Sequence, residues 1–151
     1  MRVRDVMTED VKTIAPTAAA EDAWNTMRFN RIHHLVVTKG RRVVGVLSER
    51  DAGGRRGASV RATSVVADLM TAPAVTVERT MTVREAANVM RGRSIGCLVV
   101  VESGHAIGIV TVSDLLELIG RGLDRGVVST TRRTLNHRLP HRKSKGAVAG
   151  W

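Results

Sequence analysis

The chain has 151 residues, a formal net charge of +10, one cysteine, and two Trp, one Phe and no Tyr residues. This length fits one domain or two closely packed halves with a buried core. No apolar run reaches the roughly 18 residues of a membrane-spanning helix, and no secretory signal follows Met1. The single cysteine, Cys97, excludes an internal disulfide, as is usual in reducing compartments. We therefore expect a soluble, cytoplasmic protein with no membrane partner.

The positive charge is concentrated near the C-terminus. Residues 1–120 hold 16 Lys and Arg against 13 Asp and Glu, whereas residues 121–151 hold eight basic residues against Asp124 alone. A basic segment favours anionic partners, so nucleic-acid or ribosome binding through it is one functional hypothesis. Its alternative is that the charges only keep the segment solvated. Because no apolar period continues beyond Gly122, we predict a flexible, basic tail over residues 123–151.

The rest of the chain contains an internal repeat. A shift of 63 positions, without a gap, places Asp5-Val6-Met7-Thr8 on Asp68-Leu69-Met70-Thr71 and the segment 45–51 on 108–114. Two copies are too few for an open solenoid. The repeat therefore predicts a closed pair of similar units related by pseudo-two-fold symmetry, in which any binding site occurs twice.

Both copies predict the same elements in the same order. A short helix (3–7 and 65–70) and a short strand (11–14 and 74–77) precede a helix that Thr17 or Thr80 would cap. In the first copy the buried face of that helix carries Ala20, Ala23, Trp24 and Met27, at helical spacing. A hairpin follows, with strands at 35–38 and 43–47 in the first copy and at 97–101 and 106–110 in the second. These strands are almost continuously apolar, so both faces are expected to be covered.

The two copies are expected to differ after the hairpin. A helix starts at Ser48 and at Thr111, but only the second continues, to Ile119, because Gly53-Gly54 interrupts the first. Residues 53–64 are therefore predicted to be a linker. The predicted organisation is repeat 1 at 1–57, repeat 2 at 58–122 and the tail at 123–151.

This duplicated order, with Gly-apolar-apolar-Ser/Thr-x-x-Asp closing each copy, resembles a tandem pair of CBS domains, also called a Bateman module. The resemblance covers roughly residues 1–120. It implies an α+β fold of two β-α-β-β-α repeats and a regulatory, non-enzymatic function. In that family the module binds adenine nucleotides such as AMP, ADP, ATP or S-adenosylmethionine. The resemblance also implies a homodimer that acts on an effector protein through a ligand-dependent conformational change.

The closing motif supplies the candidate ribose-binding residues. Carried over from the family, Ser48 and Asp51 form one site, and Thr111 and Asp114 form the other. An ionised carboxylate can accept hydrogen bonds from both hydroxyls of a ribose, and the three-residue spacing places hydroxyl and carboxylate on one side of a helix turn. The alternative is a helix N-cap with a favourable first-turn charge. The two roles are compatible.

The base and the phosphate would be bound by other residues. The resemblance places the base beside the first strand of each repeat, at Thr13, Ile14, Thr76 and Val77. Since aromatic residues are scarce, we expect aliphatic walls of Ile14, Val36, Val77 and Val99. Arg50 corresponds to Ser113, so we expect the first site to prefer a phosphorylated ligand and the second to be weaker or different. The alternative is that Arg50, Arg55 and Arg56 are solvated surface residues.

Catalytic and metal sites are not expected. His33 and His34 are adjacent on a predicted strand, so at most one of them would face a given site, and structural roles are favoured. Cys97 is expected to be a core thiol. No Cys and His spacing matches a zinc site, and no catalytic set stands out. The sequence predicts a binding module whose only cofactor-like partner is a regulatory nucleotide.

Overall fold

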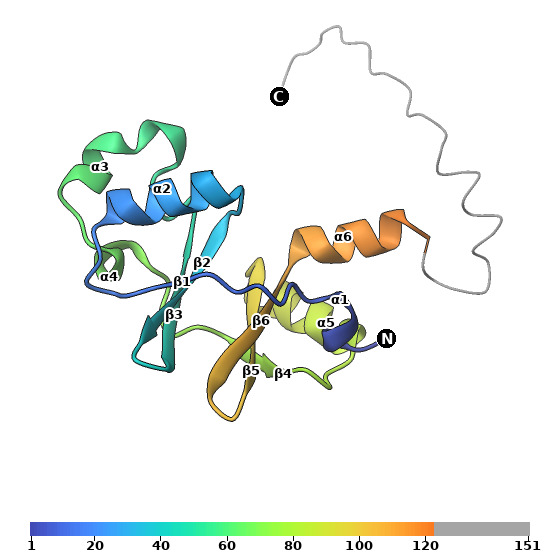
Figure 1. Ribbon diagram of the computed structural model, residues 1–151. Coiled ribbons are helices and arrows are strands. Elements are labelled where there is room, and N and C mark those ends of the chain that lie inside the picture. Colours follow the sequence, from blue (N-terminus) through green and yellow to red (C-terminus); the bar gives the residue numbers. More distant parts are fainter. Residues whose placement is uncertain (123–151) are drawn as a thin grey trace, which may run out of the picture. The chain divides into compact units, whose positions relative to one another are not determined.

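The computed structural model describes residues 1–122, so the predicted tail at 123–151 lies outside the described residues (Figure 1). Met1–Asp114 form one compact unit that contains every strand described, and the described part of a second unit begins at Leu115. Within the described residues, no helix has the length and apolar character to cross a membrane.

The first repeat forms a three-stranded sheet with a helix between its first two strands. Its elements are α1 (Val3–Val6), β1 (Thr13–Ile14), α2 (Ala20–Asn30), β2 (His34–Lys39) and β3 (Arg42–Ser48). The strand order is β1-β2-β3, with β1 parallel and β3 antiparallel to β2.

The second repeat forms the same sheet again. Its elements are α4 (Val66–Leu69), β4 (Thr76–Glu78), α5 (Val83–Arg93), β5 (Cys97–Glu102), β6 (His105–Thr111) and α6 (Val112–Gly120). The strand pairing is also the same: Thr13 pairs with Val36, and their equivalents 63 positions later, Thr76 and Val99, pair with each other. Figure 1 shows the two sheets as separate ribbons. The predicted α+β fold of two pseudo-symmetric repeats is confirmed.

The starts of the two long helices differ from the prediction. Helices α2 and α5 begin at Ala20 and Val83, so Thr17 and Thr80 are not their N-caps. Thr82 caps α5: its hydroxyl accepts from Glu85 N at 3.1 Å, and Thr82 N donates to Glu85 Oε2 at 3.1 Å. The spacing Thr82-x-x-Glu85 is a capping-box signature that carries this information in the sequence.

The segment after β3 is more ordered than the predicted linker. Instead of a helix, a series of turns follows Ser48 and leads into a 3₁₀ helix, η1 (Gly54–Arg56), and an α-helix, α3 (Ala58–Ala62). Residues 53–64 connect the two repeats as predicted, but the connection contains two short helices that were not expected. Gly53 and Gly54, expected to interrupt a helix, adopt left-handed conformations that shape a compact connection.

The leading segment of each repeat crosses to the sheet of the other repeat. Thr8 N donates to Ile109 O at 2.9 Å, and Thr71 N donates to Val46 O at 2.8 Å. A Cβ atom on Gly45 would lie 2.8 Å from Thr71 O, and one on Gly108 would lie 2.6 Å from Met7 Sδ. The glycine of each closing motif therefore leaves room for the segment that crosses over it.

The core beneath the first sheet is built from both repeats. The predicted face of α2 is buried, with Met27 fully enclosed and Trp24 8% exposed. Val66, from α4 of the second repeat, is fully buried in the same cluster. The central strand β2 is buried on both faces, as its apolar run predicts. The complete cluster of buried residues is Ala23, Trp24, Met27, Leu35, Val37, Leu47, Ala52 and Val66.

Candidate functional site

The two closing motifs have the same local geometry. In the first, Ser48 N donates to Asp51 Oδ2 at 3.1 Å, and Asp51 N donates to Ser48 Oγ at 2.9 Å. In the second, Thr111 N donates to Asp114 Oδ2 at 2.8 Å, and Asp114 N donates to Thr111 Oγ1 at 3.2 Å. Each pair is a reciprocal cap. The Oδ1 atom of each carboxylate accepts no hydrogen bond from a described residue, so the capping role leaves this oxygen available for a ligand.

The first motif borders a cavity of about 660 Å³, which we call the first cavity. Ser48, Arg50 and Asp51 contribute to its wall from repeat 1. Thr71 adjoins them from the second repeat, and its hydroxyl donates to Asp51 Oδ2 at 3.4 Å. The second repeat supplies Thr71, Pro73, Ala74, Val75, Ser94, Ile95, Gly96 and Cys97 to the lining.

The second motif borders a cavity of about 330 Å³, the second cavity. Thr111, Ser113 and Asp114 line it from repeat 2. Nearly every residue that repeat 1 contributes to the second cavity has its equivalent, 63 positions later, in the lining of the first cavity. The two cavities are therefore equivalent sites of the pseudo-symmetric pair. The first repeat supplies Thr8, Asp10, Val11, Lys12, Arg31, Ile32, His33, His34 and Val36. Each cavity therefore combines the motif of one repeat with the leading segment and the helix–strand connection of the other.

The structure brings some of the predicted site residues together and leaves others apart. Ser48, Arg50 and Asp51 line the first cavity, and Thr111 and Asp114 line the second. The base-binding candidates of β1 and β4 line neither cavity. Thr13 and Thr76 are exposed, Ile14 is half-buried and packs against the core, and Val77 is buried.

The apolar part of each cavity wall is aliphatic, as expected, but most of it comes from residues other than the predicted ones. Of the predicted wall residues, only Val36 lines one of the two cavities, while Val99 is fully buried. The apolar lining lies just before the first strand of each repeat, at the helix–strand connection, on the last strand and, for Val36, on the central strand β2. It consists of Val46, Val75 and Ile95 in the first cavity and of Val11, Ile32, Val36 and Ile109 in the second.

Two basic residues of the second cavity were missed from the sequence. Arg31 and Lys12 line this cavity, and Lys12 Nζ lies 3.1 Å from Asp10 Oδ2. The expectation that only the first site has an arginine rests on building each site from the residues of one repeat. Because each cavity also takes residues from the other repeat, each has an arginine: Arg50 in the first and Arg31, at the end of α2, in the second. The repeat itself could have indicated them, because in a closed pair each copy packs against the other and residues of both copies can line one site.

Both histidines of the adjacent pair line both cavities. The expectation that at most one would face a site is wrong, because His33 precedes β2 and does not follow the strand alternation. His33 Nδ1 lies 3.1 Å from Glu49 Oε1. Burial lowers the pKa of His34, and nearby His33 lowers it further, against the opposing pull of Asp51, Asp114 and Glu49. His34 is therefore a neutral imidazole near neutral pH.

The thiol of Cys97 belongs to the wall of the first cavity. It is only half-buried, at the start of β5, so it is not the core thiol that the sequence suggested. Burial, with a contribution from Asp114, raises the pKa of the Cys97 thiol to about 12. A protonated thiol is a weak nucleophile and a poor metal ligand. Among residues 1–122, no group of three or more His, Cys, Asp or Glu side chains is arranged to hold a metal ion.

Comparisons with known proteins agree with this geometry. The model of the CBS domain matches residues 3–52 and 66–121. Inosine-5'-monophosphate dehydrogenase of Korarchaeum cryptofilum is 36% identical over 76% of this chain and 23% of the relative. Protein MK0525 of Methanopyrus kandleri is 32% identical over 77% of this chain and 61% of the relative. The chain thus spans less than two thirds of either relative, and the enzyme is matched over less than a quarter of its length.

A solved structure shares the fold. The CBS domain pair of protein MJ0100, in complex with 5'-methylthioadenosine and S-adenosyl-L-methionine, aligns with a TM-score of 0.72. The alignment has 22% sequence identity and covers 80% of this chain and 96% of the other. At this identity the similarity establishes the arrangement of the elements.

Proposed function

The chain belongs to the CBS domain family, a family of regulatory modules, and on this basis we propose that it binds adenine nucleotides in the two inter-repeat cavities. The observation that carries the proposal is the pair of carboxylates, Asp51 and Asp114, each with one oxygen that has no hydrogen-bond partner among residues 1–122, in a cavity of ligand size. In the neighbour MJ0100, both bound molecules contain an adenosine group, which supports an adenosine-containing ligand here.

The cavity walls suggest how each part of a nucleotide would be held. The free carboxylate oxygen would accept the ribose hydroxyls with charge-assisted hydrogen bonds. The base would lie between aliphatic side chains such as Val75 and Ile95 in the first cavity, since the described lining has no Phe, Tyr or Trp residue. Backbone groups of the segments that cross between the repeats would then read its edge. Thr13, Ile14, Thr76 and Val77 would support these segments from the adjoining strands.

We propose that the first cavity prefers the more highly phosphorylated ligand. Each cavity has an arginine, so the presence of a guanidinium does not separate them. The first cavity has twice the volume of the second. In the second, Lys12 is already paired with Asp10, which reduces the positive charge available to phosphate. The second cavity would be weaker or accept a smaller adenosine compound.

The proposed output is a change in how the two repeats are held together. A nucleotide in either cavity contacts both repeats, so binding favours the arrangement in which the cavity is complete. An effector protein or domain that binds one arrangement better would detect the ligand. A homodimer in the cytoplasm remains part of the proposal, and sedimentation velocity with and without nucleotide tests the oligomeric state.

The experiment is a thermal unfolding series on the full chain with AMP, ADP, ATP, S-adenosylmethionine and NAD. A ligand at about 100 times its dissociation constant should stabilise the protein by about 2.7 kcal/mol. Asp51→Ala and Asp114→Ala should each remove part of the shift, with ATP more sensitive to Asp51. Asp22→Ala, at an exposed position of α2, is the charge-matched control. If none of the five ligands raises the unfolding temperature, the proposed function is wrong.

A further inference from the structure

The first cavity is bordered by a segment that has no counterpart in the second repeat. After Thr111, the second motif continues directly into helix α6. After Ser48, the first motif turns back on itself, with Gly53 and Gly54 in left-handed conformations at φ 91° and 62°. A Cβ atom on Gly57 would lie 2.5 Å from Gly53 Cα, so the two ends of this loop are in close contact. We call residues 49–57 the first-cavity turn.

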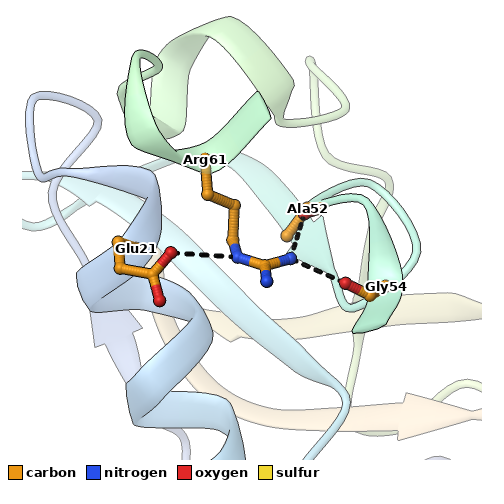
Figure 2. Close-up of polar contacts among 4 residues, drawn as sticks. All are labelled: Glu21, Ala52, Gly54 and Arg61. Atoms are coloured by element: carbon orange, nitrogen blue, oxygen red, sulfur yellow. Dashed lines mark hydrogen bonds and ion pairs between the residues drawn. The ribbon is translucent and has the colours of Figure 1, made fainter. Parts of the chain in front are cut away.

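Arg61 of α3 reaches into the first-cavity turn and holds its backbone. Its Nη1 donates to Ala52 O at 2.8 Å and to Gly54 O at 2.7 Å, and its Nε donates to Glu21 Oε1 at 3.2 Å, as Figure 2 shows. The guanidinium carbon lies 3.9 Å from the centroid of the Trp24 ring. The Arg61 side chain is only 4% exposed, so this charge has been removed from water and all these contacts compensate for it.

The carbonyls that Arg61 binds adjoin the ligand-binding candidates. Ala52 follows Asp51 directly, and Gly54 itself lines the first cavity, as does Arg50. The start of the first-cavity turn is fixed by the reciprocal bonds between Ser48 and Asp51. Arg61 fixes its middle, at Ala52 and Gly54, so Arg50 and Asp51 lie in a stretch that is anchored before and after them.

The partners of Arg61 exist only in the first repeat. In the 63-residue register, Trp24 corresponds to Ala87, and Glu21 corresponds to Arg84, which has the opposite charge. The second repeat therefore lacks both the ring and the carboxylate that hold the guanidinium. Its motif is instead followed by the hydrogen-bonded backbone of α6. The Arg61 contacts act on one cavity of the two.

We propose that Arg61 is a positioning residue for the first cavity: from α3, it fixes the first-cavity turn so that Arg50 and Asp51 are preorganised for a nucleotide. Arg61 does not touch the ligand. A lysine in its place keeps the charge but cannot form the same fork of hydrogen bonds. The turn then has to be ordered when the ligand binds, which lowers the affinity of that cavity. This role rests on the proposed nucleotide binding.

The test separates the two cavities by isothermal titration calorimetry with ATP. In an Asp114→Ala background, where the first cavity remains, Arg61→Lys is expected to weaken ATP binding by about tenfold or more. In an Asp51→Ala background, where the second cavity remains, the same substitution should change the affinity by less than about twofold. Arg28→Lys is the matched control, because exposed Arg28 lies over the same Trp24 ring, at 5.6 Å, and reaches neither carbonyl.

Hydrogen–deuterium exchange on the ligand-free protein gives a readout independent of nucleotide. Arg61→Lys should increase exchange in residues 49–57 and leave residues 71–75 unchanged. If Arg61→Lys does not fold, Glu21→Gln loosens the same anchor by removing one charge, and a smaller effect on the same cavity is expected. Unchanged exchange in the first-cavity turn, unchanged ATP binding in the Asp114→Ala background, or an equal loss in both cavities overturns the positioning role.

The two proposals fail in different ways. If the unmodified protein binds none of the five ligands of the unfolding series, the proposed function is wrong and the ligand role of Arg61 is overturned with it, while the exchange experiment still reports whether Arg61 holds the turn. If the unmodified protein binds ATP and the Arg61→Lys variants bind it equally well, nucleotide binding stands and the positioning role alone is wrong.

Discussion

The ends of the two repeats carry the same motif in different surroundings. Ser48 and Asp51 cap each other as Thr111 and Asp114 do, and the corresponding distances differ by only a few tenths of an ångström. Beyond the aspartate, the second repeat continues as a helix, and the first forms a glycine-rich turn anchored by buried Arg61. The motif alone determines how the carboxylate is presented. The segment that follows it determines how rigid the adjacent cavity wall is.

The largest effect is expected where the two ends differ most. Gly57 and Gly120 occupy equivalent positions, but a Cβ atom on Gly57 would lie 2.5 Å from Gly53 Cα, whereas one on Gly120 would meet nothing within 4 Å. Gly57→Ala should lower the free energy of unfolding by about 3 kcal/mol, because backbone has to move. Gly120→Ala should be neutral or slightly stabilising. Urea denaturation measures both, and equal effects would contradict the described turn.

The crossing of the leading segments can be compared in the same way. A Cβ atom on Gly45 would press on the backbone oxygen of Thr71 at 2.8 Å, whereas one on Gly108 would chiefly meet the flexible side chain of Met7. We expect Gly45→Ala to destabilise the protein by about 2 kcal/mol and Gly108→Ala by about 1 kcal/mol. Differential scanning calorimetry checks the order. A larger loss from Gly108→Ala would show that the crossing segments are not packed as described.

Much of the fold follows from the sequence, because the helical and strand periods occur twice in register. The capping aspartates and their hydroxyl partners were predictable for the same reason, since the motif is local. The cavity residues Lys12 and Arg31 were not, because they lie near the motif of the other repeat only when the two repeats are packed together. Arg61 was not either: in a stretch rich in Gly, Arg and Ser, nothing local distinguishes a buried arginine from solvated ones. Its burial depends on Trp24, which lies 37 positions earlier in the chain.

The helix starts differ on a smaller scale. Thr82 caps α5, whereas the equivalent Ala19 has no side-chain oxygen to cap α2. Thr82→Ala should destabilise the protein by about 1 kcal/mol, and Ala19→Ser should stabilise it by up to about that amount. Chemical denaturation of the two variants tests this. An Ala19→Ser variant that is less stable than the unmodified protein would show that the start of α2 is constrained by more than its missing cap.

The smallest expected effect is a pH dependence of the free energy of unfolding. It comes from His34 of the first repeat, because the equivalent residue of the second repeat is Cys97 and not a histidine. The lowered pKa of His34 means that the unfolded chain takes up its proton first as the pH falls. The contribution of His34 to the free energy of unfolding is fully present above pH 6.5, the ordinary pKa of histidine. It is lost as the pH falls from there toward the lower pKa of the folded state. His34→Asn should flatten the stability profile in this window. A profile that is equally steep in the variant would assign the dependence to other groups.

The account depends most on where a nucleotide binds, and a crystal structure of the full chain grown with a saturating concentration of AMP tests this most directly. We predict AMP between the two repeats, with its ribose hydroxyls on the free oxygen of Asp51 or Asp114 and its base between aliphatic side chains such as Val75 and Ile95 or Val11 and Ile32. AMP bound outside both cavities, or in a cavity with its ribose away from the carboxylate, would contradict the central claim.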